Sequence, residues 1–218
     1  MPKDWVGNKA STFKMIAATN HAPEGYERES RDFYATEPKA AELLLEVEPN
    51  LTNIWENAAG KCHLANVFEK AGKLGRKSDI INRMDDPNLE VKDFLTSSGK
   101  GLLGKKEVWD GDIVTNPPYA FAQEWVEKSI ETVTEGHKVC LFLKLTFLEG
   151  QARREMYKKY PPKVVYVCSS RICCAMNGEF EVLDKKTGKM KPIGSAVCYA
   201  WFVWEKGFKG DPIIKWIN

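Results

Sequence analysis

Short apolar runs alternate with amphipathic stretches along the chain from Phe33 onward. Short apolar runs indicate buried strands, whereas apolar positions three and four residues apart indicate helices. The runs predict seven strands, in the segments 51–56, 78–81, 91–95, 112–115, 137–144, 164–168 and 196–204. Helices are predicted after Pro38, with Thr36 as the N-cap, over 64–71, after Pro118 and over 149–160. This alternation is typical of an α/β fold made of βαβ units.

The order of these elements predicts how the sheet is assembled. Helices between strands favour parallel neighbours and helices on both faces of the sheet. The segments 164–168 and 196–204 have no helical pattern between them, so we expect them to pair as an antiparallel hairpin at the sheet edge. The prediction is therefore a mostly parallel seven-stranded sheet with an antiparallel edge hairpin.

Length and composition are those of a globular protein. The chain has 218 residues, of which 43% are hydrophobic and 28% charged, which gives room for one sizeable core. We expect an irregular N-terminal arm over 1–30 and a single domain over 31–218. The longest apolar run, 196–204, is about half as long as a membrane-spanning helix, and no secretory signal is visible. We therefore expect a soluble cytoplasmic protein with no membrane partner.

Charge and cysteine content add little to this picture. Lys and Arg outnumber Asp and Glu by 32 to 30, which neither favours nor excludes a nucleic-acid partner. No two of the six cysteines form a Cys-x-x-Cys pair, and the three histidines are scattered. This pattern predicts reduced thiols and no metal site.

The turn after the first predicted strand is a candidate ligand site. Its small residues Ala58 and Gly60 would let a ligand approach the backbone and the N-terminus of the next helix. Asp79 follows Gly60 by 19 positions, at the end of the second strand, where a carboxylate suits ribose hydroxyls. A single glycine in such a turn is also compatible with a simple tight turn. The lack of a Gly-x-Gly-x-x-Gly motif disfavours a dinucleotide.

A second candidate site is the segment Asn116-Pro117-Pro118-Tyr119 at the end of the fourth predicted strand. Two prolines stop a strand, so a rigid turn is the simplest explanation. The side-chain oxygen of Asn116 and the backbone oxygen of Pro117 would, however, be two hydrogen-bond acceptors beside the flat ring of Tyr119. Such a group suits a planar NH₂ substituent, because both of its hydrogens are held and its lone pair is directed at an electrophile.

At this point the sequence resembles a known family. Asn116-Pro117-Pro118-Tyr119 is similar to the catalytic motif of the S-adenosylmethionine-dependent DNA adenine (amino) methyltransferases, and the wording of the chain most resembles the compact phage and prophage members. The resemblance implies the class I methyltransferase (Rossmann-like) fold, S-adenosyl-L-methionine as cofactor, DNA with a flipped-out adenine as substrate, and a bacterial or phage-infected cell. It also implies a cofactor site made of Phe33, Tyr34, Ala35, Thr36, Glu56, Ala58, Gly60, Asp79, Ile80, Asp93 and Phe94.

Two departures from the family pattern bear on function. Cys62 stands where the cofactor loop usually has its second glycine, and a Cβ there restricts positive φ. The chain also shows no separate target-recognition domain, and the segment 171–194 is the only candidate for a small target-contacting insert. We expect the phosphate contacts to come from basic residues in that insert and in the helix 149–160, namely Arg153, Arg154, Lys158, Lys185 and Lys186.

The sequence leaves other functions open. The same four residues, Asn116 to Tyr119, would serve an RNA adenine or a glutamine amide in a protein, since both carry a planar NH₂ group. A protein of another class, which binds nucleic acid but has lost catalysis because of Cys62, is a further alternative.

Overall fold

The computed structural model describes residues 34–96, 107–175, 178–184, 187–193 and 197–218. The predicted arm over 1–30, and the predicted site residues Phe33, Lys185 and Lys186, lie outside these ranges. The chain divides at Asp32, and the fold described below belongs to the second part, 33–218.

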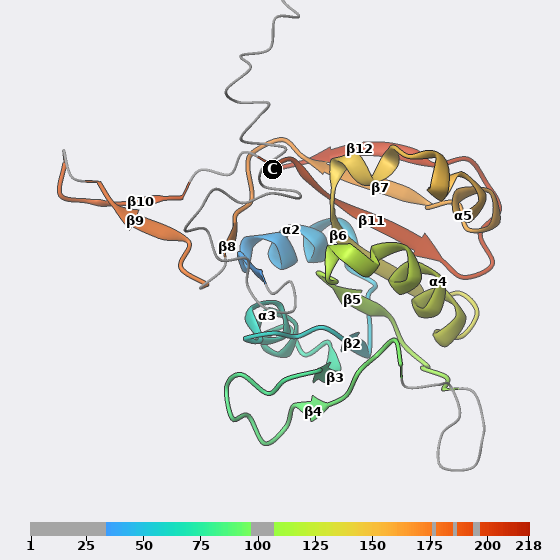
Figure 1. The fold of residues 1–218 in the computed structure, drawn as a ribbon, viewed down its shortest axis with the longest axis horizontal. Helices are drawn as coiled ribbons and strands as arrows, with labels where there is room; N and C mark the ends of the chain where they lie inside the picture. Colours follow the sequence, from blue (N-terminus) through green and yellow to red (C-terminus); the bar gives the residue numbers. More distant parts are fainter. Residues whose placement is uncertain (1–33, 97–106, 176–177, 185–186, 194–196) are drawn as a thin grey trace, which may run out of the picture. The chain divides into compact units, whose positions relative to one another are not determined.

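An eight-stranded sheet forms the centre of this part of the chain (Figure 1). Its order is β12-β7-β11-β6-β5-β2-β3-β4, and each strand is parallel to its neighbours except β11. All seven predicted strands are present, and the α/β fold is confirmed. The strands are β2 (Ile54–Glu56), β3 (Leu74–Asp79), β4 (Glu90–Val91), β5 (Ile113–Thr115), β6 (Lys138–Lys144), β7 (Val164–Cys168), β11 (Tyr199–Glu205) and β12 (Ile213–Ile217).

The edge of the sheet differs from the prediction. Strands β7 and β11 do pair in antiparallel fashion, but the additional strand β12 runs parallel to β7 and forms the edge. The sheet therefore has eight strands rather than seven, and the antiparallel pair is not at its edge. The prediction missed β12 even though four of its five residues are apolar, because Ile213, Ile214 and Trp216 are exposed and the segment does not alternate between a buried and an exposed face.

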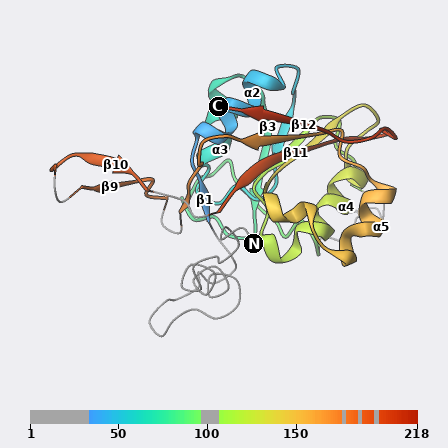
Figure 2. The same ribbon diagram turned by 90° about the horizontal axis from the view of Figure 1, so that it is seen from above.

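Helices cover both faces of the sheet, as predicted. Helices α2 (Lys39–Val47) and α3 (His63–Lys70) lie on one face, and α4 (Ala122–Thr132) and α5 (Arg154–Lys159) lie on the other (Figure 2). Three 3-10 helices complete this part of the structure: η2 (Tyr119–Phe121), η3 (Leu145–Leu148) and η4 (Gln151–Arg153). None of the helices in the described ranges is long and apolar enough to cross a membrane.

The central strands alternate between the two helical layers. On β6, Phe142 joins the core cluster under α2 and α3, whereas Leu141 and Leu143 join the cluster under α4 and α5. Strand β11 does the same with Trp201 and Phe202, and both of these side chains are fully buried. Side chains of a strand point to opposite faces in turn, so one continuous apolar run supplies both cores.

The predicted insert 171–194 contributes strands to two small sheets. Strand β8 (Cys174–Ala175) pairs with β1 (Ala35–Thr36), which precedes the first helix. Strands β9 (Glu181–Leu183) and β10 (Met190–Pro192) form a hairpin that extends away from the main sheet (Figures 1 and 2). The base of the hairpin packs on α3, because the ring of Phe180 meets the ring of His63 edge-on at 5.3 Å.

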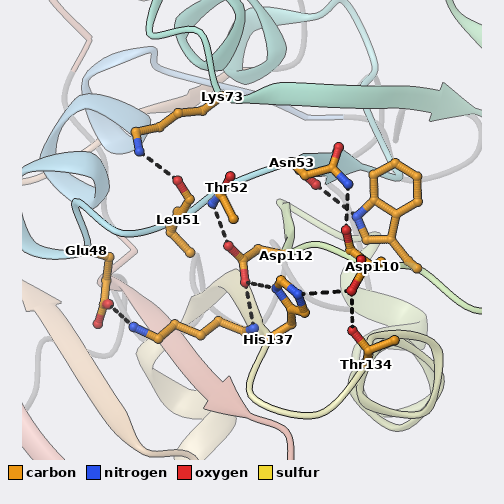
Figure 3. A network of polar contacts seen from close by, with 11 residues as sticks. Glu48, Leu51, Thr52, Asn53, Lys73, Asp110, Asp112, Thr134 and His137 are labelled. Atoms are coloured by element: carbon orange, nitrogen blue, oxygen red, sulfur yellow. Dashed lines mark hydrogen bonds and ion pairs between the residues drawn. The ribbon is translucent and has the colours of Figure 1, made fainter.

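Polar contacts fix the amino ends of the central strands (Figure 3). The carboxylate of Asp112, just before β5, accepts hydrogen bonds from the main-chain N–H groups of Thr52 (2.7 Å) and Lys138 (2.7 Å). The ammonium of Lys138 in turn donates to Glu48 at 2.6 Å. These residues precede or begin β2, β5 and β6, so the network sets the relative positions of the three strands. Their carboxyl ends, at the opposite edge, are where α/β sheets bind ligands.

Candidate active site

The two candidate sites lie side by side at the carboxyl edge of the sheet. Strand β2 leads into the turn that begins at Glu56, and its neighbour β5 leads into Asn116. Strand β3, on the other side of β2, ends at Asp79, whose carboxylate accepts a hydrogen bond from the main-chain N–H of Gly60 at 2.8 Å. The structure thus places the predicted catalytic motif next to the predicted cofactor turn.

The side chain of Asn116 is held with its acceptor free. Its Nδ2 donates to the hydroxyl of Thr36 at 2.7 Å and to the main-chain oxygen of Tyr34 at 3.3 Å. Its Oδ1 is buried and has no hydrogen-bond partner among the described residues. Buried polar atoms are nearly always paired, so this oxygen is suited to accept a hydrogen from a ligand. The contact also explains why Thr36 does not cap α2: Pro38 stands at the N-cap and the Thr36 hydroxyl binds Asn116.

Replacing Thr36 by Val should lower the rate of the methyl transfer expected from the sequence about tenfold. The change keeps the shape of the side chain but removes the acceptor at 2.7 Å, which leaves Nδ2 of Asn116 with only the longer contact to Tyr34. A hydrogen bond of this kind is worth about 1 kcal/mol or somewhat more, which is about tenfold in rate. The measurement is kcat under saturating substrate. A Thr36→Ser variant, which retains the hydroxyl, should recover most of the rate, and an equal loss in both variants would contradict the role of the hydroxyl.

Tyr119 is half-buried beside two residues that the sequence analysis did not identify. Its hydroxyl lies 3.8 Å from Sγ of Cys174, on β8, and its ring stacks on that of Tyr199, the first residue of β11, at 6.2 Å and 29°. Burial raises the pKa of the Tyr119 hydroxyl well above its ordinary value, so the phenol is neutral. Neither neighbour belongs to a motif, and only the fold brings them to this edge.

Two buried polar atoms in the cofactor turn have no partner in the described part of the chain. One is Oε2 of Glu56, a side chain that is 2% exposed, and the other is Nδ2 of Asn57, which is 1% exposed. Burial raises the pKa of the Glu56 carboxyl well above its ordinary value, although a hydrogen bond from the main chain of Ala65 lowers it. The other end of the Asn57 amide accepts a hydrogen bond from Trp125 at 2.9 Å. Sequence reasoning missed Asn57, which carried no motif signal.

Asp79 retains room for one more hydrogen bond. Its carboxylate accepts from the main-chain N–H groups of Gly60 (2.8 Å) and Ile81 (3.0 Å) and from Arg83 (3.0 Å), whereas a carboxylate offers about four acceptor positions. The next side chain, Ile80, is 45% exposed. The buried carboxylate and the exposed apolar side chain are therefore both available to a ligand.

Asp93 and Phe94, which are predicted to contact the cofactor, make their described contacts within the protein. The carboxylate of Asp93 accepts hydrogen bonds from the main-chain N–H groups of Leu95 (3.0 Å) and Thr96 (3.2 Å), and contacts with Thr96 are the largest cause of its lowered pKa. The ring of Phe94 is 1% exposed and packs against Trp55 and Trp125, with centroids 5.5 and 5.0 Å away. Its ring belongs to the core, and a role of Asp93 and Phe94 in cofactor binding stays a prediction.

Cys62 adopts a left-handed backbone conformation, which favours glycine. Its φ is 61°, that of Gly60 is 55°, and its side chain is buried at the start of α3. A residue with a Cβ is strained in this region by about 1–2 kcal/mol. The turn at Cys62 therefore holds a backbone conformation that favours glycine.

This strain gives a prediction for two variants at position 62. Cys62→Gly should unfold with a free energy about 1 kcal/mol larger than Cys62→Ala, because both lose the thiol but only alanine keeps a Cβ at positive φ. Urea unfolding of the two variants measures the difference. Equal stabilities would show that the turn relaxes around the Cβ.

The predicted nucleic-acid contacts fall into two groups. Arg154 and Lys158 are exposed on α5, and Lys158 pairs with Glu155 at 2.7 Å. Arg153 instead serves the protein itself, because its guanidinium donates to the main-chain oxygens of Phe147 and Glu149 and lies 4.8 Å from the centre of the Phe147 ring. A contact between any of them and DNA stays a prediction.

Comparisons with known proteins give matches at the level of structure. No protein-family model matches the sequence, and the curated protein sequences give no significant match. An S-adenosylmethionine-dependent O-methyltransferase from Thermotoga maritima matches 84% of this chain with a TM-score of 0.52 and 12% identity, over 70% of its own length.

Two chains from restriction enzymes match as well. They are the type IIG restriction endonuclease BpuSI (TM-score 0.53, 12% identity, 84% of this chain) and the M protein of the type I restriction enzyme EcoKI (TM-score 0.50, 10% identity, 83% of this chain). This chain spans 26% of the first and 45% of the second. The order of the sheet, the helices on both faces and these structural matches show that the chain has the fold of the class I S-adenosylmethionine-dependent methyltransferases.

Proposed function

We propose that this protein is an S-adenosylmethionine-dependent methyltransferase that methylates the exocyclic amino group of adenine in DNA. The observation that carries the proposal is the buried, unpaired Oδ1 of Asn116. That oxygen lies at the carboxyl edge of β5, next to the turn after β2 where this fold would take its cofactor.

The residues of the cofactor turn fit S-adenosylmethionine. The ligand carries an ammonium group, a carboxylate and ribose hydroxyls, and the site has unpaired polar atoms on Glu56 and Asn57 and a free acceptor position on Asp79. We assign Glu56 to the ammonium and Asp79 to the ribose. Tyr34 and Ala35 come just before Thr36, whose hydroxyl contacts Asn116. We assign these two residues to the methionine portion of the cofactor.

The catalytic role of Asn116 follows from hydrogen bonding. Its Oδ1 and the main-chain oxygen of Pro117 would each accept one hydrogen of the adenine amino group, which turns the nitrogen lone pair out of conjugation. S-adenosylmethionine, when bound, supplies an electrophilic methyl group on a sulfonium. The C–N bond forms as the C–S bond breaks, and the nitrogen then loses its extra proton to water. Positioning supplies most of the rate.

DNA is the favoured substrate for two reasons. Reaching an adenine inside a duplex requires the base to leave the stack, and Tyr119 provides an aromatic surface next to Asn116 for such a base. Two of the structural matches come from restriction enzymes, which are DNA-modifying systems. The exposed Arg154 and Lys158, together with Lys185 and Lys186, would contribute phosphate contacts.

The test is a methyl-transfer assay with matched DNA and RNA oligonucleotides and labelled S-adenosylmethionine. Digestion of the products to nucleosides should yield label in N6-methyladenine from DNA. Label in RNA alone, or in cytosine alone, would contradict the proposal. Absence of both transfer and S-adenosylmethionine binding, with binding recovered in Cys62→Gly, would instead favour a protein that binds nucleic acid without catalysis.

A further inference from the structure

Lys144 covers the ring on which the target adenine would stack. It is the last residue of β6, and its ammonium lies over the ring of Tyr119, 5.0 Å from the centroid. Stacked aromatic rings have centroids about 4.5–7 Å apart. The ammonium therefore lies at the distance from Tyr119 that a stacked base would take, so a base on the same face of the ring would have to displace it.

The sheet fixes this placement. Lys144 is directly opposite Tyr199 in the antiparallel pairing of β6 with β11, and Tyr199 is the residue that stacks on Tyr119. The side chain thus arises from the same pair of strands that forms the wall of the site.

The cation is held over the ring only weakly. None of the ion pairs in the described part of the chain includes Lys144. The groups around Tyr119 carry no negative charge: Tyr199 is a phenol, and burial raises the pKa of the Cys174 thiol to about 11. A lysine over an aromatic ring gains little at a partly exposed site, so a stronger partner can draw it away.

We propose that Lys144 lies over Tyr119 while the base site is empty and moves to a backbone phosphate of the DNA when adenine takes its place. The inference rests on the proposed function. The phosphates flanking a flipped nucleotide stay at the mouth of the site, and a long, flexible side chain with a point charge suits such a contact. Lys144 would then be a positioning residue that couples a phosphate contact to the opening of the base site.

The test compares Lys144→Met with Lys144→Arg, and with Lys215→Met as a matched control. Lys215 is on β12 and also lies over a tyrosine, with its ammonium 5.9 Å from the Tyr166 ring centroid, but away from the catalytic edge. The probe is a DNA duplex with the sequence found by the methylation assay, carrying 2-aminopurine at the target position. Its dissociation constant is measured over a series of salt concentrations.

Loss of one phosphate contact should reduce the slope of log Kd against log salt by about 0.9 in Lys144→Met. The slope should return in Lys144→Arg and stay unchanged in Lys215→Met. At saturating protein the 2-aminopurine fluorescence of Lys144→Met should equal or exceed that of the wild type, since the base no longer displaces a cation. A wild-type slope in Lys144→Met, or reduced fluorescence at saturation, would overturn the proposal.

Methylation by the wild-type protein is measured in parallel on the same duplex with adenine at the target position, because 2-aminopurine lacks the amino group that would accept the methyl. A wild type that methylates adenine while Lys144→Met keeps its salt slope contradicts only the role of Lys144. A wild type that binds adenine-containing duplexes without methylating them contradicts the proposed function. Should Lys144→Met fail to fold, Lys144→Gln serves in the same comparison.

Discussion

Replacing Asn116 by Ala is expected to reduce methyl transfer about 10²–10³-fold while the Kd for S-adenosylmethionine stays nearly constant. The variant removes the acceptor that would hold one hydrogen of the amino group, an interaction needed where charge develops on the nitrogen. The side chain of Asn116 donates to Tyr34 and Thr36 and, among the described residues, makes no hydrogen bond to the turn at Glu56, so the change in Kd should be much smaller than the change in rate. Rates come from single-turnover transfer of label, and the Kd comes from calorimetry.

Two further variants control this experiment. Asn66→Ala removes an exposed asparagine from α3 and should leave both quantities unchanged. Asn116→Asp keeps an oxygen acceptor but brings a second oxygen toward Thr36 in place of the donor, so its rate should fall between those of wild type and Asn116→Ala. Full activity in Asn116→Ala would remove the basis of the proposed function.

The fold could be predicted from the sequence wherever burial sets the pattern. The strands at β5, β6 and β11 are apolar because both of their faces are covered, and the same burial that folds them makes them visible in the sequence. Strand β12 escaped prediction although four of its five residues are apolar, because they do not alternate with polar residues, and four of its five side chains are exposed beside β7. The edge of the sheet was the least predictable part for this reason.

The site could be predicted only where its residues are contiguous in sequence. The motif Asn116 to Tyr119 and the turn at Glu56 are short segments whose position after a strand places them at one edge. The orientation of Asn116 depends on Thr36, 80 positions away, and the wall beside Tyr119 is built by Cys174, 55 positions away. Such contacts exist only once β1 has paired with β8, and no local sequence pattern predicts them.

Replacing Glu56 by Gln is expected to weaken binding of S-adenosylmethionine about 10–100-fold and to abolish a coupled release of protons. The carboxylate oxygen Oε2 is buried and has no hydrogen-bond partner among the described residues, which is unfavourable for a charge. A cationic ammonium group beside it would supply that partner. A hydrogen bond between charged groups is worth about 1.5–3 kcal/mol, which corresponds to the expected loss of affinity.

The direction of the pH dependence follows from the raised pKa of Glu56. In the folded protein without ligand, the carboxyl keeps its proton to a higher pH than it does in the unfolded chain, where its pKa is close to 4.5. The folded state therefore binds more protons between these two pKa values, and the free energy of unfolding contributed by this group falls as pH rises through that window. A bound cation lowers the pKa of the carboxyl, so binding releases a proton and the affinity for S-adenosylmethionine rises with pH in the same window.

Calorimetry in two buffers of different ionisation enthalpy measures this proton release directly. Wild type should show a difference in apparent binding enthalpy between the buffers, and Glu56→Gln should show none. Glu69→Gln, which changes an exposed glutamate on the neighbouring helix α3, should behave as the wild type. If wild type binds S-adenosylmethionine with the same enthalpy in both buffers across the pH series, Glu56 is ionised before the ligand arrives. Its burial at 2% exposure would then have to be balanced by a partner within the protein rather than by the cofactor.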